Sequence, residues 1–141
     1  MLLARGRGFA LPLPDGWQDR TVLTLVEPAP EGEGSASIVV TRDQLPSGTS
    51  PDAYAGMHEA VLRAEAGSRL ERLECDQLRV AGRPAAVRSY RWSLGEEVLR
   101  QRIWCIASDG VGLCITASAP EARFEQLAPA FATAVDGFRL E

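Results

Sequence analysis

Residues 83–118 decide the fold, and they read RPAAVRSYRWSLGEEVLRQRIWCIASDGVGLCITAS. The stretch predicts three consecutive strands, Arg83–Trp92, Glu97–Ala107 and Val111–Ser118. The second break contains Asp109 followed by Gly110, a pair that readily adopts the positive φ angles of a tight hairpin. Because connections this short join only antiparallel strands, we expect a meander at the centre of one sheet.

The middle strand of this meander is apolar on both faces. Alternation along the strand separates two sets of side chains, Leu99, Ile103 and Cys105 on one face and Val98, Trp104 and Ile106 on the other. A sheet with one face in water would alternate more cleanly between apolar and polar residues. Both faces therefore need a cover, and we expect the chain to have enough helix to cover only one of them well.

The rest of the chain predicts an α+β domain, with a mostly antiparallel, twisted sheet of about seven strands and two main helices. The other strands are expected at Gly8–Leu13, Thr21–Glu27, Ala36–Arg42 and Leu70–Val80. Pro28–Gly34, rich in proline, glycine and glutamate, is expected to be a loop. A length of 141 residues fits one domain that spans residues 1–141.

The first helix is well marked by its end signals. Ser50 is a favourable N-cap, and Gly67 ends a helix that runs to about Ala66. The spacing predicts a core stripe of Tyr54, Met57, Val61 and Ala64. A second row lies beside that stripe and consists of His58, Leu62 and Ala66.

The second helix is expected to begin at Ser118 or Pro120 and to end at Gly137. Its apolar stripe consists of Phe124, Leu127, Phe131 and Val135. Pro129 lies inside this stretch and is expected to kink or split the helix, because proline removes a helical hydrogen bond.

The composition excludes several classes of protein. A net charge of −4 argues against a nucleic-acid binder, and no stretch approaches the ~20 apolar residues of a membrane span. We therefore expect no nucleic-acid partner and no direct membrane insertion. The first residues show no long apolar run after the arginines, so we expect no secretory signal and a cytoplasmic location. Cys75, Cys105 and Cys114 are expected to be reduced thiols that act as small hydrophobic residues.

Few residues of the sequence suggest catalytic chemistry. His58 is the single histidine, so a Ser-His-Asp or Cys-His site would have to include it, and a structural or surface role is favoured for it. No convergent set of His, Cys and carboxylate ligands predicts a metal site. Arg100 and Arg102 share one strand face, where salt-bridged or solvated side chains are favoured over an anion site. We expect no enzyme activity, no catalytic residue, no metal and no cofactor.

A second apolar surface is the better functional signal. Val22, Thr24, Val26 and Val39 lie opposite the residues expected under the helix, which are Leu23, Leu25, Ile38 and Val40. With Leu62 and Ala66 of the first helix, these side chains would form a shallow apolar groove, which would mark a binding site. The alternative is that a second helix or a twin subunit covers this face as ordinary core.

Several stretches, taken in order along the chain, resemble the DcrB-related proteins of the Mog1/PsbP-like fold. Within that family they resemble the Eag chaperones, which are encoded beside effectors of the type VI secretion system. The matching stretches are residues 13–22 (LPDGWQDRTV), 38–43 (IVVTRD), 82–86 (GRPAA), 90–92 (YRW), 116–120 (TASAP) with Phe124, and 138–140 (FRL). Together they cover nearly the whole chain.

The resemblance implies a homodimer whose sheets form a cradle. The cradle would shield the apolar, membrane-inserting helices near the N-terminus of a client effector until export. Carried across by position, the apolar client-binding residues are Val22, Thr24, Val39, Leu62, Ala66 and Val98. Two polar client-binding positions, glutamine in the chaperones, fall on His58 and on Arg102, or on Gln101 if the hairpin is one residue shorter.

Two other functions stay open at this point. One is a generic protein-binding module of the same fold, with a soluble partner. The other is an enzyme or small-ligand binder with a pocket near Arg100 and Arg102.

Overall fold

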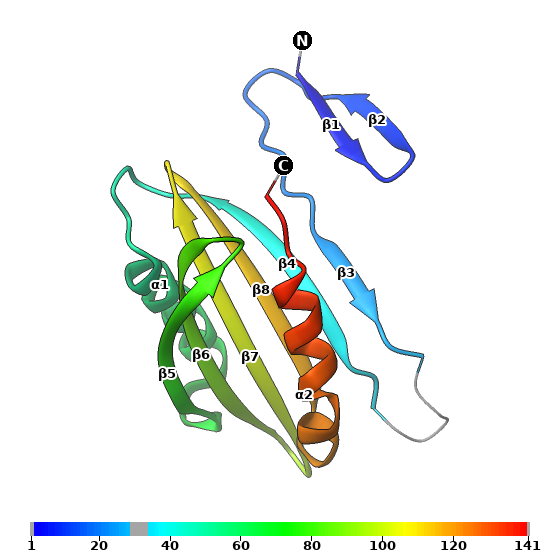
Figure 1. Ribbon diagram of the computed structural model, residues 1–141, viewed down its shortest axis with the longest axis vertical. Helices are drawn as coiled ribbons and strands as arrows, with labels where there is room; N and C mark the ends of the chain where they lie inside the picture. Colours follow the sequence, from blue (N-terminus) through cyan, green and yellow to red (C-terminus); the bar gives the residue numbers. More distant parts are fainter. Residues whose placement is uncertain (1, 29–33, 141) are drawn as a thin grey trace.

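Six strands form one antiparallel sheet in the order β3-β4-β8-β7-β6-β5 (Figure 1). The computed structural model describes residues 2–28 and 34–140. The strands are β3 (Leu23–Val26), β4 (Ser37–Gln44), β5 (Leu70–Val80), β6 (Arg83–Leu94), β7 (Glu97–Ser108) and β8 (Val111–Pro120). The predicted meander β6-β7-β8 is confirmed, and each of its strands extends one or two residues beyond the prediction at its C-terminal end.

Short turns hold the meander in register. Asp109 and Gly110 have φ angles of 51° and 78°, so the turn between β7 and β8 has the mirror-image geometry that matches the twist of the strands. Ser108 pairs with Val111 across this turn. The turn between β5 and β6 is built in the same way by Ala81 and Gly82.

The first helix, α1 (Pro51–Ala66), has the predicted ends. The Ser50 side chain accepts a hydrogen bond of 3.0 Å from the Ala53 N–H, and Gly67 adopts a φ of 57° where the helix ends. A short 3₁₀ turn, η1 (Gly67–Arg69), leads from the helix into β5.

The second helix, α2 (Glu121–Asp136), follows Pro120 directly and ends at Gly137. Pro129 lies inside it, but the helix continues through this residue and is not split. The Thr133 hydroxyl donates a 3.0 Å hydrogen bond to the Pro129 carbonyl, one turn earlier.

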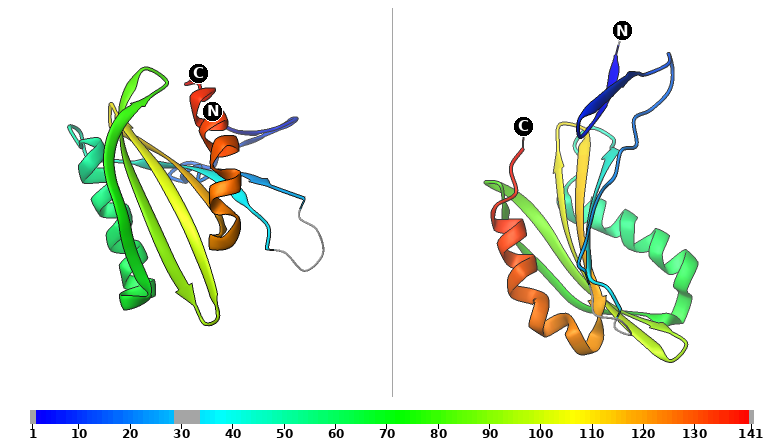
Figure 2. Two further views of the ribbon diagram at one scale, coloured as in Figure 1. Left: turned by 60° about the horizontal axis from the view of Figure 1, so that its bottom comes forward. Right: turned by 90° about the vertical axis from the view of Figure 1, so that its right-hand side faces the viewer.

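The two helices lie on opposite faces of the sheet (Figure 2). The expectation that helix would cover only one face is therefore wrong: each helix covers part of one face. Under α2 lies a core that includes Trp104, Ile106, Ile115, Phe124 and Phe131. Under α1 lies a second core that includes Tyr54, Tyr90, Ile103, Cys105 and Cys114.

The N-terminal segment forms a separate two-stranded hairpin. β1 (Leu3–Gly6) pairs with β2 (Phe9–Pro12), which occupies the strand predicted at Gly8–Leu13. β1 was not predicted. Most of the loop expected at Pro28–Gly34 lies outside the described residues.

Candidate functional site

The face of the sheet under α1 is only half covered. The helix packs against β6 and β7 and touches β5 at the edge of the sheet. The α1 side of β8, β4 and β3 therefore lies beside the helix, and Figure 2 shows this displacement to one half of the sheet.

The uncovered half carries a mixture of apolar and hydroxyl side chains. Thr24, Val39 and Thr116 lie opposite one another across three strands, so they share one face of the sheet. Cys114, two residues before Thr116, belongs to the α1-side core and identifies that face. We call this surface the open strip, and it comprises Thr24, Val26, Ser37, Val39, Thr41, Thr116 and Ser118. Val22 directly precedes β3, and we include it because it continues the alternation of Thr24 and Val26.

Contacts on the two flanks of α1 fix the orientation of this helix beside the open strip. On one flank, Asp52 binds Arg88 of β6 at 3.0 Å. On the other flank, the Tyr54 hydroxyl donates a hydrogen bond to the Asp43 carboxylate of β4. The flank that carries Tyr54 therefore faces the open strip.

Met57 and Val61 follow Tyr54 at helical spacing and are 49% and 62% exposed. The predicted core stripe is therefore confirmed for Tyr54, which is buried, and wrong for Met57, Val61 and Ala64, which are exposed. The residues that α1 turns to the sheet are Tyr54, Ala55, His58, Glu59, Leu62 and Ala66. Met57 and Val61 instead extend the apolar surface of the open strip onto the helix.

His58 lies between the helix and the sheet, half-buried. A hydrogen bond with the Cys114 thiol raises the pKa of His58 above its ordinary value. Burial lowers this pKa, and the negative charge of Asp43 raises it, so that the net shift is upward. The His58 Nδ1 atom is buried and has no hydrogen-bond partner among the described residues.

Two buried thiols of the α1-side core lie near His58. The Sγ atoms of Cys105 and Cys114 are 3.8 Å apart, and neither cysteine forms a disulfide. The hydrogen bond with Cys105 and burial raise the pKa of Cys114 well above its ordinary value, so the thiol stays protonated. A protonated, fully buried thiol is a poor nucleophile.

Gln101 is a second polar residue on this side of the sheet. Its side-chain NH₂ donates a 3.1 Å hydrogen bond to the Ser118 hydroxyl. Its Oε1 atom is buried without a partner in the described structure, and so is the indole Nε1 of Trp92. Trp92 and Gln101 lie on adjacent strands and on the same face. A buried donor or acceptor without a partner is costly, so these two atoms lower the stability of this side of the sheet.

The structure brings together most, but not all, of the predicted client-binding residues. Those on the α1 side are Val22, Thr24, Val39, His58, Leu62, Ala66 and Gln101. Ala66 is only 5% exposed and Leu62 packs against the core, so these two contribute mainly to helix packing.

Val98 and Arg102 lie on the opposite face, and placing them in the same site was wrong. Side chains alternate along β7, so these two residues share the α2 side with Trp104, while Gln101 shares the α1 side with Ile103. Of the two alternatives for the second polar position, the structure places Gln101, and not Arg102, beside the open strip.

The arginines of the α2 side are held by the protein itself. Arg102 binds Glu74 at 3.1 Å, and its guanidinium lies 5.4 Å from the centre of the Trp104 indole. Arg100 lies over the Phe124 ring at 4.9 Å and within 4.0 Å of the Glu121 carboxylate. The salt-bridged arrangement that the sequence favoured is therefore what the structure contains.

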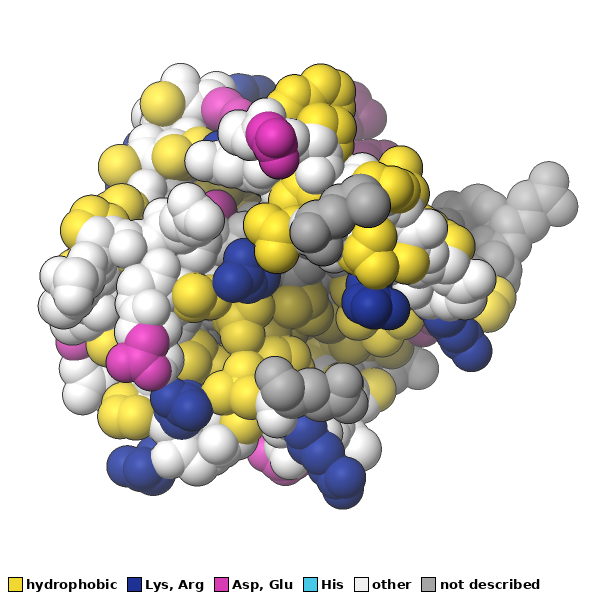
Figure 3. All heavy atoms as spheres, turned by 90° about the horizontal axis from the view of Figure 1, so that it is seen from above, with side chains coloured by type: hydrophobic (Ala, Val, Ile, Leu, Met, Phe, Trp, Pro, Cys, Tyr) yellow, Lys and Arg dark blue, Asp and Glu magenta, His cyan; other side chains and the backbone are white. Residues whose placement is uncertain are grey.

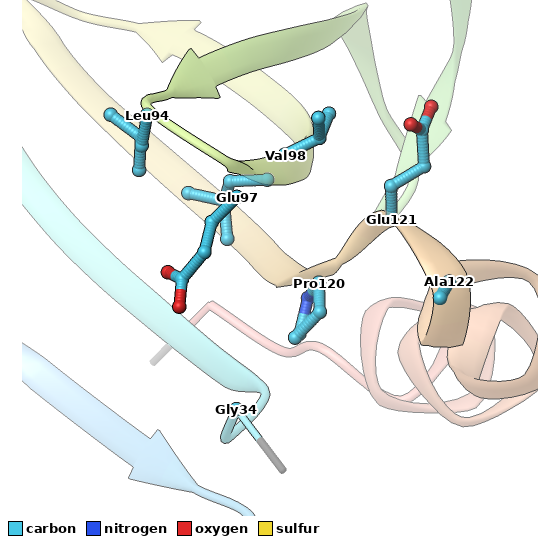
Figure 4. Close-up of a pocket in the computed structure, with 8 residues that line it drawn as sticks. Gly34, Leu94, Glu97, Val98, Pro120, Glu121 and Ala122 are labelled. Carbon is cyan, nitrogen blue, oxygen red and sulfur yellow. The ribbon is translucent and has the colours of Figure 1, made fainter.

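Val98 lines a cleft of about 460 Å³ at the tip of the β6–β7 hairpin (Figure 4). Its carboxylates, Glu97 and Glu121, point away from each other in Figure 4. Glu121 also binds Arg91. This cleft therefore lacks a facing pair of acids.

Within residues 2–28 and 34–140, no cluster of three or more His, Cys, Asp or Glu side chains is arranged to hold a metal ion. Neither α1 nor α2 has the length and apolar character that a membrane-crossing helix requires.

Comparison with known proteins gives one family match. The model of the DcrB family matches residues 9–137, which is most of the chain. None of the curated proteins matches.

Three solved structures share the fold. PA94, a protein of unknown function from Pseudomonas aeruginosa, is 23% identical, with a TM-score of 0.79 over 100% of this chain and 97% of that chain. The cyanobacterial PsbP protein of Synechocystis sp. PCC 6803 is 13% identical, with a TM-score of 0.60 over 94% of this chain and 86% of that chain. LpqN of Mycobacterium tuberculosis, involved in cell envelope biogenesis, is 20% identical, with a TM-score of 0.53 over 91% of this chain and 79% of that chain. The predicted PsbP-like α+β fold is confirmed.

Proposed function

The chain belongs to the DcrB family, and from this premise we propose that it is a cytoplasmic chaperone for a type VI secretion effector. It binds the hydrophobic helices near the N-terminus of that effector and shields them before export. The role requires no catalysis and no cofactor.

The observation that supports this proposal is the apolar surface formed by the open strip and the outer row of α1. Val26 and Val61 are each 62% exposed, and Val22 and Met57 are each 49% exposed. A helix flank beside an uncovered sheet face suits a helical client, which would lie along α1 with its apolar side on the strip.

The free energy of such a contact is substantial. A membrane helix of ~20 apolar residues left in water aggregates or inserts into the wrong bilayer. Each Å² of apolar surface removed from water contributes roughly 25 cal/mol. The unpaired atoms of His58 and Gln101 are buried in the free chain, so each side chain would have to rotate before it could pair with a polar group of the client.

Co-expression with the N-terminal hydrophobic region of the effector encoded next to this protein tests the proposal. We expect that region to stay in the soluble fraction only when the chaperone is present. Equal solubility of the client without the chaperone would refute the proposal.

Two variants test where the client binds. Val61→Asp and Val39→Asp place a charge on the helix row and on the strip, and we expect both to lose the client while remaining folded. Leu62→Asp is a weaker test, because Leu62 packs against the α1-side core. Leu73→Asp is the matched control, since Leu73 is 36% exposed on β5 at the far edge of the sheet. If Leu73→Asp abolished binding and Val61→Asp did not, the binding surface would be elsewhere.

The hydroxyl groups of the strip favour a second candidate, a binding module for a soluble partner. Thr24 and Thr41 interrupt the apolar side chains, and a purely apolar helix offers their hydroxyls no hydrogen-bond partner. Titration with two helical peptides, one uniformly apolar and one amphipathic, separates the candidates. Tighter binding of the amphipathic peptide would favour the soluble partner.

A further inference from the structure

The cleft at the tip of the β6–β7 hairpin continues the open strip. It has a volume of about 460 Å³ and is lined by Leu94, Glu97, Val98, Leu99 and Pro120, among others. Pro120 follows Ser118 of the open strip by two residues and pairs with Leu99, so both lie on the face of the strip. We call this space the tip cleft, and it lies where the open strip ends.

The walls of the tip cleft are mainly apolar. Leu94, Leu99 and Pro120 lie on the side of the open strip, and Val98 contributes from the other face of β7. Leu94 is 41% exposed, so this wall is open to water. Apolar walls around an open space favour an occupant that brings a hydrocarbon part.

Glu97 gives the tip cleft a negative charge. It lies two residues before Leu99 and therefore shares the face of the open strip. Its carboxylate points toward the Gly34 side of the cleft (Figure 4). Glu97 forms no ion pair with any residue that the structure describes.

The arginines around the tip cleft already have other acidic partners. Arg91 binds Glu121, the second carboxylate of the lining, and Arg100 lies 4.0 Å from the same carboxylate. Arg123 binds Glu27 at 2.7 Å. The charge of Glu97 is therefore the one in this lining that a cation from outside the chain would neutralise.

We propose that the tip cleft holds a lysine or arginine side chain of the client, at a position that precedes an apolar helix on the open strip. Such a side chain combines a hydrocarbon stem with a charged end. The stem lies against Leu99 and Pro120, and the charged end pairs with Glu97. The tip cleft rests on the proposed function for its role, and it adds the residue type and the direction that the chaperone selects.

The dipole of the client helix sets that direction. The first turn of a helix carries a partial positive charge, about half an elementary charge, so it is favoured beside Glu97. Lysine and arginine are common next to membrane-spanning helices. α1 ends at the same end of the sheet, because Leu70, just after the helix, pairs with Trp92, and Trp92 pairs with Leu99. The client therefore lies antiparallel to α1.

The opposite end of the open strip offers less to a client cation. A cleft there is lined by two arginines and two aspartates, Arg20, Arg42, Asp19 and Asp43. Asp19 accepts a 2.9 Å hydrogen bond from the Thr21 N–H, and Asp43 accepts one from Tyr54. Seen from this end, where both termini lie, arginine side chains border a hollow of hydrophobic side chains (Figure 3).

The distance between the two ends suits one membrane-spanning helix. β8 runs from one end to the other, and its 10 residues span roughly 34 Å at ~3.4 Å per residue. A helix of ~20 residues is about 30 Å long. A client helix that begins at the tip cleft therefore ends beside the contact between Tyr54 and Asp43.

Hexylammonium chloride tests the tip cleft without a client, because this cation joins a hydrocarbon stem to an ammonium group. Amide resonances of the full chain are followed during the titration, with hexanol as the uncharged control ligand. We expect saturable shifts at Leu94, Glu97 and Leu99 with hexylammonium. Glu97→Gln should weaken the binding of hexylammonium roughly two- to five-fold, as expected for an exposed ion pair.

Glu96→Gln is the matched control for this titration. Glu96 precedes Glu97, is exposed and does not line the tip cleft, so its removal changes the net charge equally and should leave the affinity unchanged. Equal affinity of wild type and Glu97→Gln, or equal weakening by both variants, would overturn the inference.

Two probe helices test the direction of the client. Each is a segment of ~20 leucine and alanine residues in the same fusion to a soluble carrier, with a pair of lysines either before or after the segment. We expect the wild type to bind the probe with the leading lysines roughly two- to five-fold more tightly. Glu97→Gln should abolish this preference, Glu97→Lys should reverse it, and Glu96→Gln should keep it.

The outcomes separate the tip cleft from the proposed function. Equal binding of both probes to the wild type, or a preference that survives Glu97→Gln, refutes the inference and leaves the chaperone role intact. If neither probe binds the wild type, the proposed function is refuted, and the hexylammonium titration still decides whether the tip cleft takes a basic side chain.

Discussion

The central meander and the N-terminal region of the chain differ sharply in how they meet water. Ile103 and Cys105 of β7 are 1% and 0% exposed, with one helix above and one helix below the sheet. By contrast, Phe9 of β2 is 65% exposed and Leu25 of β3 is 52% exposed, although both are as hydrophobic as the core. The helices of the chain cover the meander on both faces, whereas the described residues leave these apolar side chains of the N-terminal region in contact with water.

The largest expected effect is the difference in unfolding free energy between a variant in the meander and a variant in β3. Ile103→Ala should lower the free energy of unfolding by about 2–5 kcal/mol, because it leaves a cavity in a packed core. Leu25→Ala should change it by less than about 0.5 kcal/mol, because the side chain is more than half exposed. Urea denaturation of each variant measures both values. Equal losses would show that β3 is as well packed as β7, contrary to the structure.

Replacing two different glycines by alanine should change the stability of the protein in opposite directions. A Cβ atom at Gly112 of β8 would lie 2.6 Å from the Tyr54 ring, so Gly112→Ala should destabilise the protein by about 1–3 kcal/mol. Gly56 of α1 has open space around it, and Gly56→Ala should stabilise by about 0.5–1 kcal/mol through helix propensity. Thermal unfolding of the pair measures the difference. A stabilising Gly112→Ala would mean that the helix and sheet are more loosely packed than described.

The hydrogen bond from Tyr54 to Asp43 joins the well-packed helix to β4, at the border of the open strip. Tyr54→Phe removes the donor and should cost about 1–2 kcal/mol, since the acceptor is a carboxylate. A double-mutant cycle with Asp43→Asn isolates the pair. If the coupling energy is near zero, α1 is held by the β5–β6 side alone.

The smallest expected effect is a pH dependence at His58. Its folded-state pKa is raised above the ordinary unfolded value of about 6.5, so its contribution to stability is complete below that pH. The contribution is lost as the pH rises through the raised pKa. The stability difference between wild type and His58→Gln should therefore be greater at about pH 5.5 than at about pH 8.5. The opposite trend in denaturation midpoints would contradict the assigned direction.

Helix ends and tight turns were predictable from the sequence, because each depends on a few adjacent residues. Ser50 and Gly67 predicted the two ends of α1, and Asp109-Gly110 predicted the turn between two strands of the meander. β5 was predicted with the bounds that the structure shows.

The candidate site was predicted only in part, and the errors have a common cause. Two adjacent apolar rows run along α1, and helical periodicity alone does not say whether Met57 or His58 faces the sheet. Carrying positions across from a family placed Val98 and Arg102 beside Val39, but a shift of one residue moves a side chain to the other face of a strand.

The sequence by itself determined the family, through stretches that match it in order along the chain. It also determined the antiparallel meander and the positions of the two helices, because turns, caps and alternation are local patterns. Only the tertiary structure decided which face each helix covers, which row of α1 borders the open strip, and that β1 and β2 form a sheet of their own. Those features depend on contacts between segments far apart in the chain, such as Tyr54 with Asp43 and Asp52 with Arg88. No local pattern specifies such contacts, since the same amphipathic helix packs on either face of a sheet that is apolar on both sides.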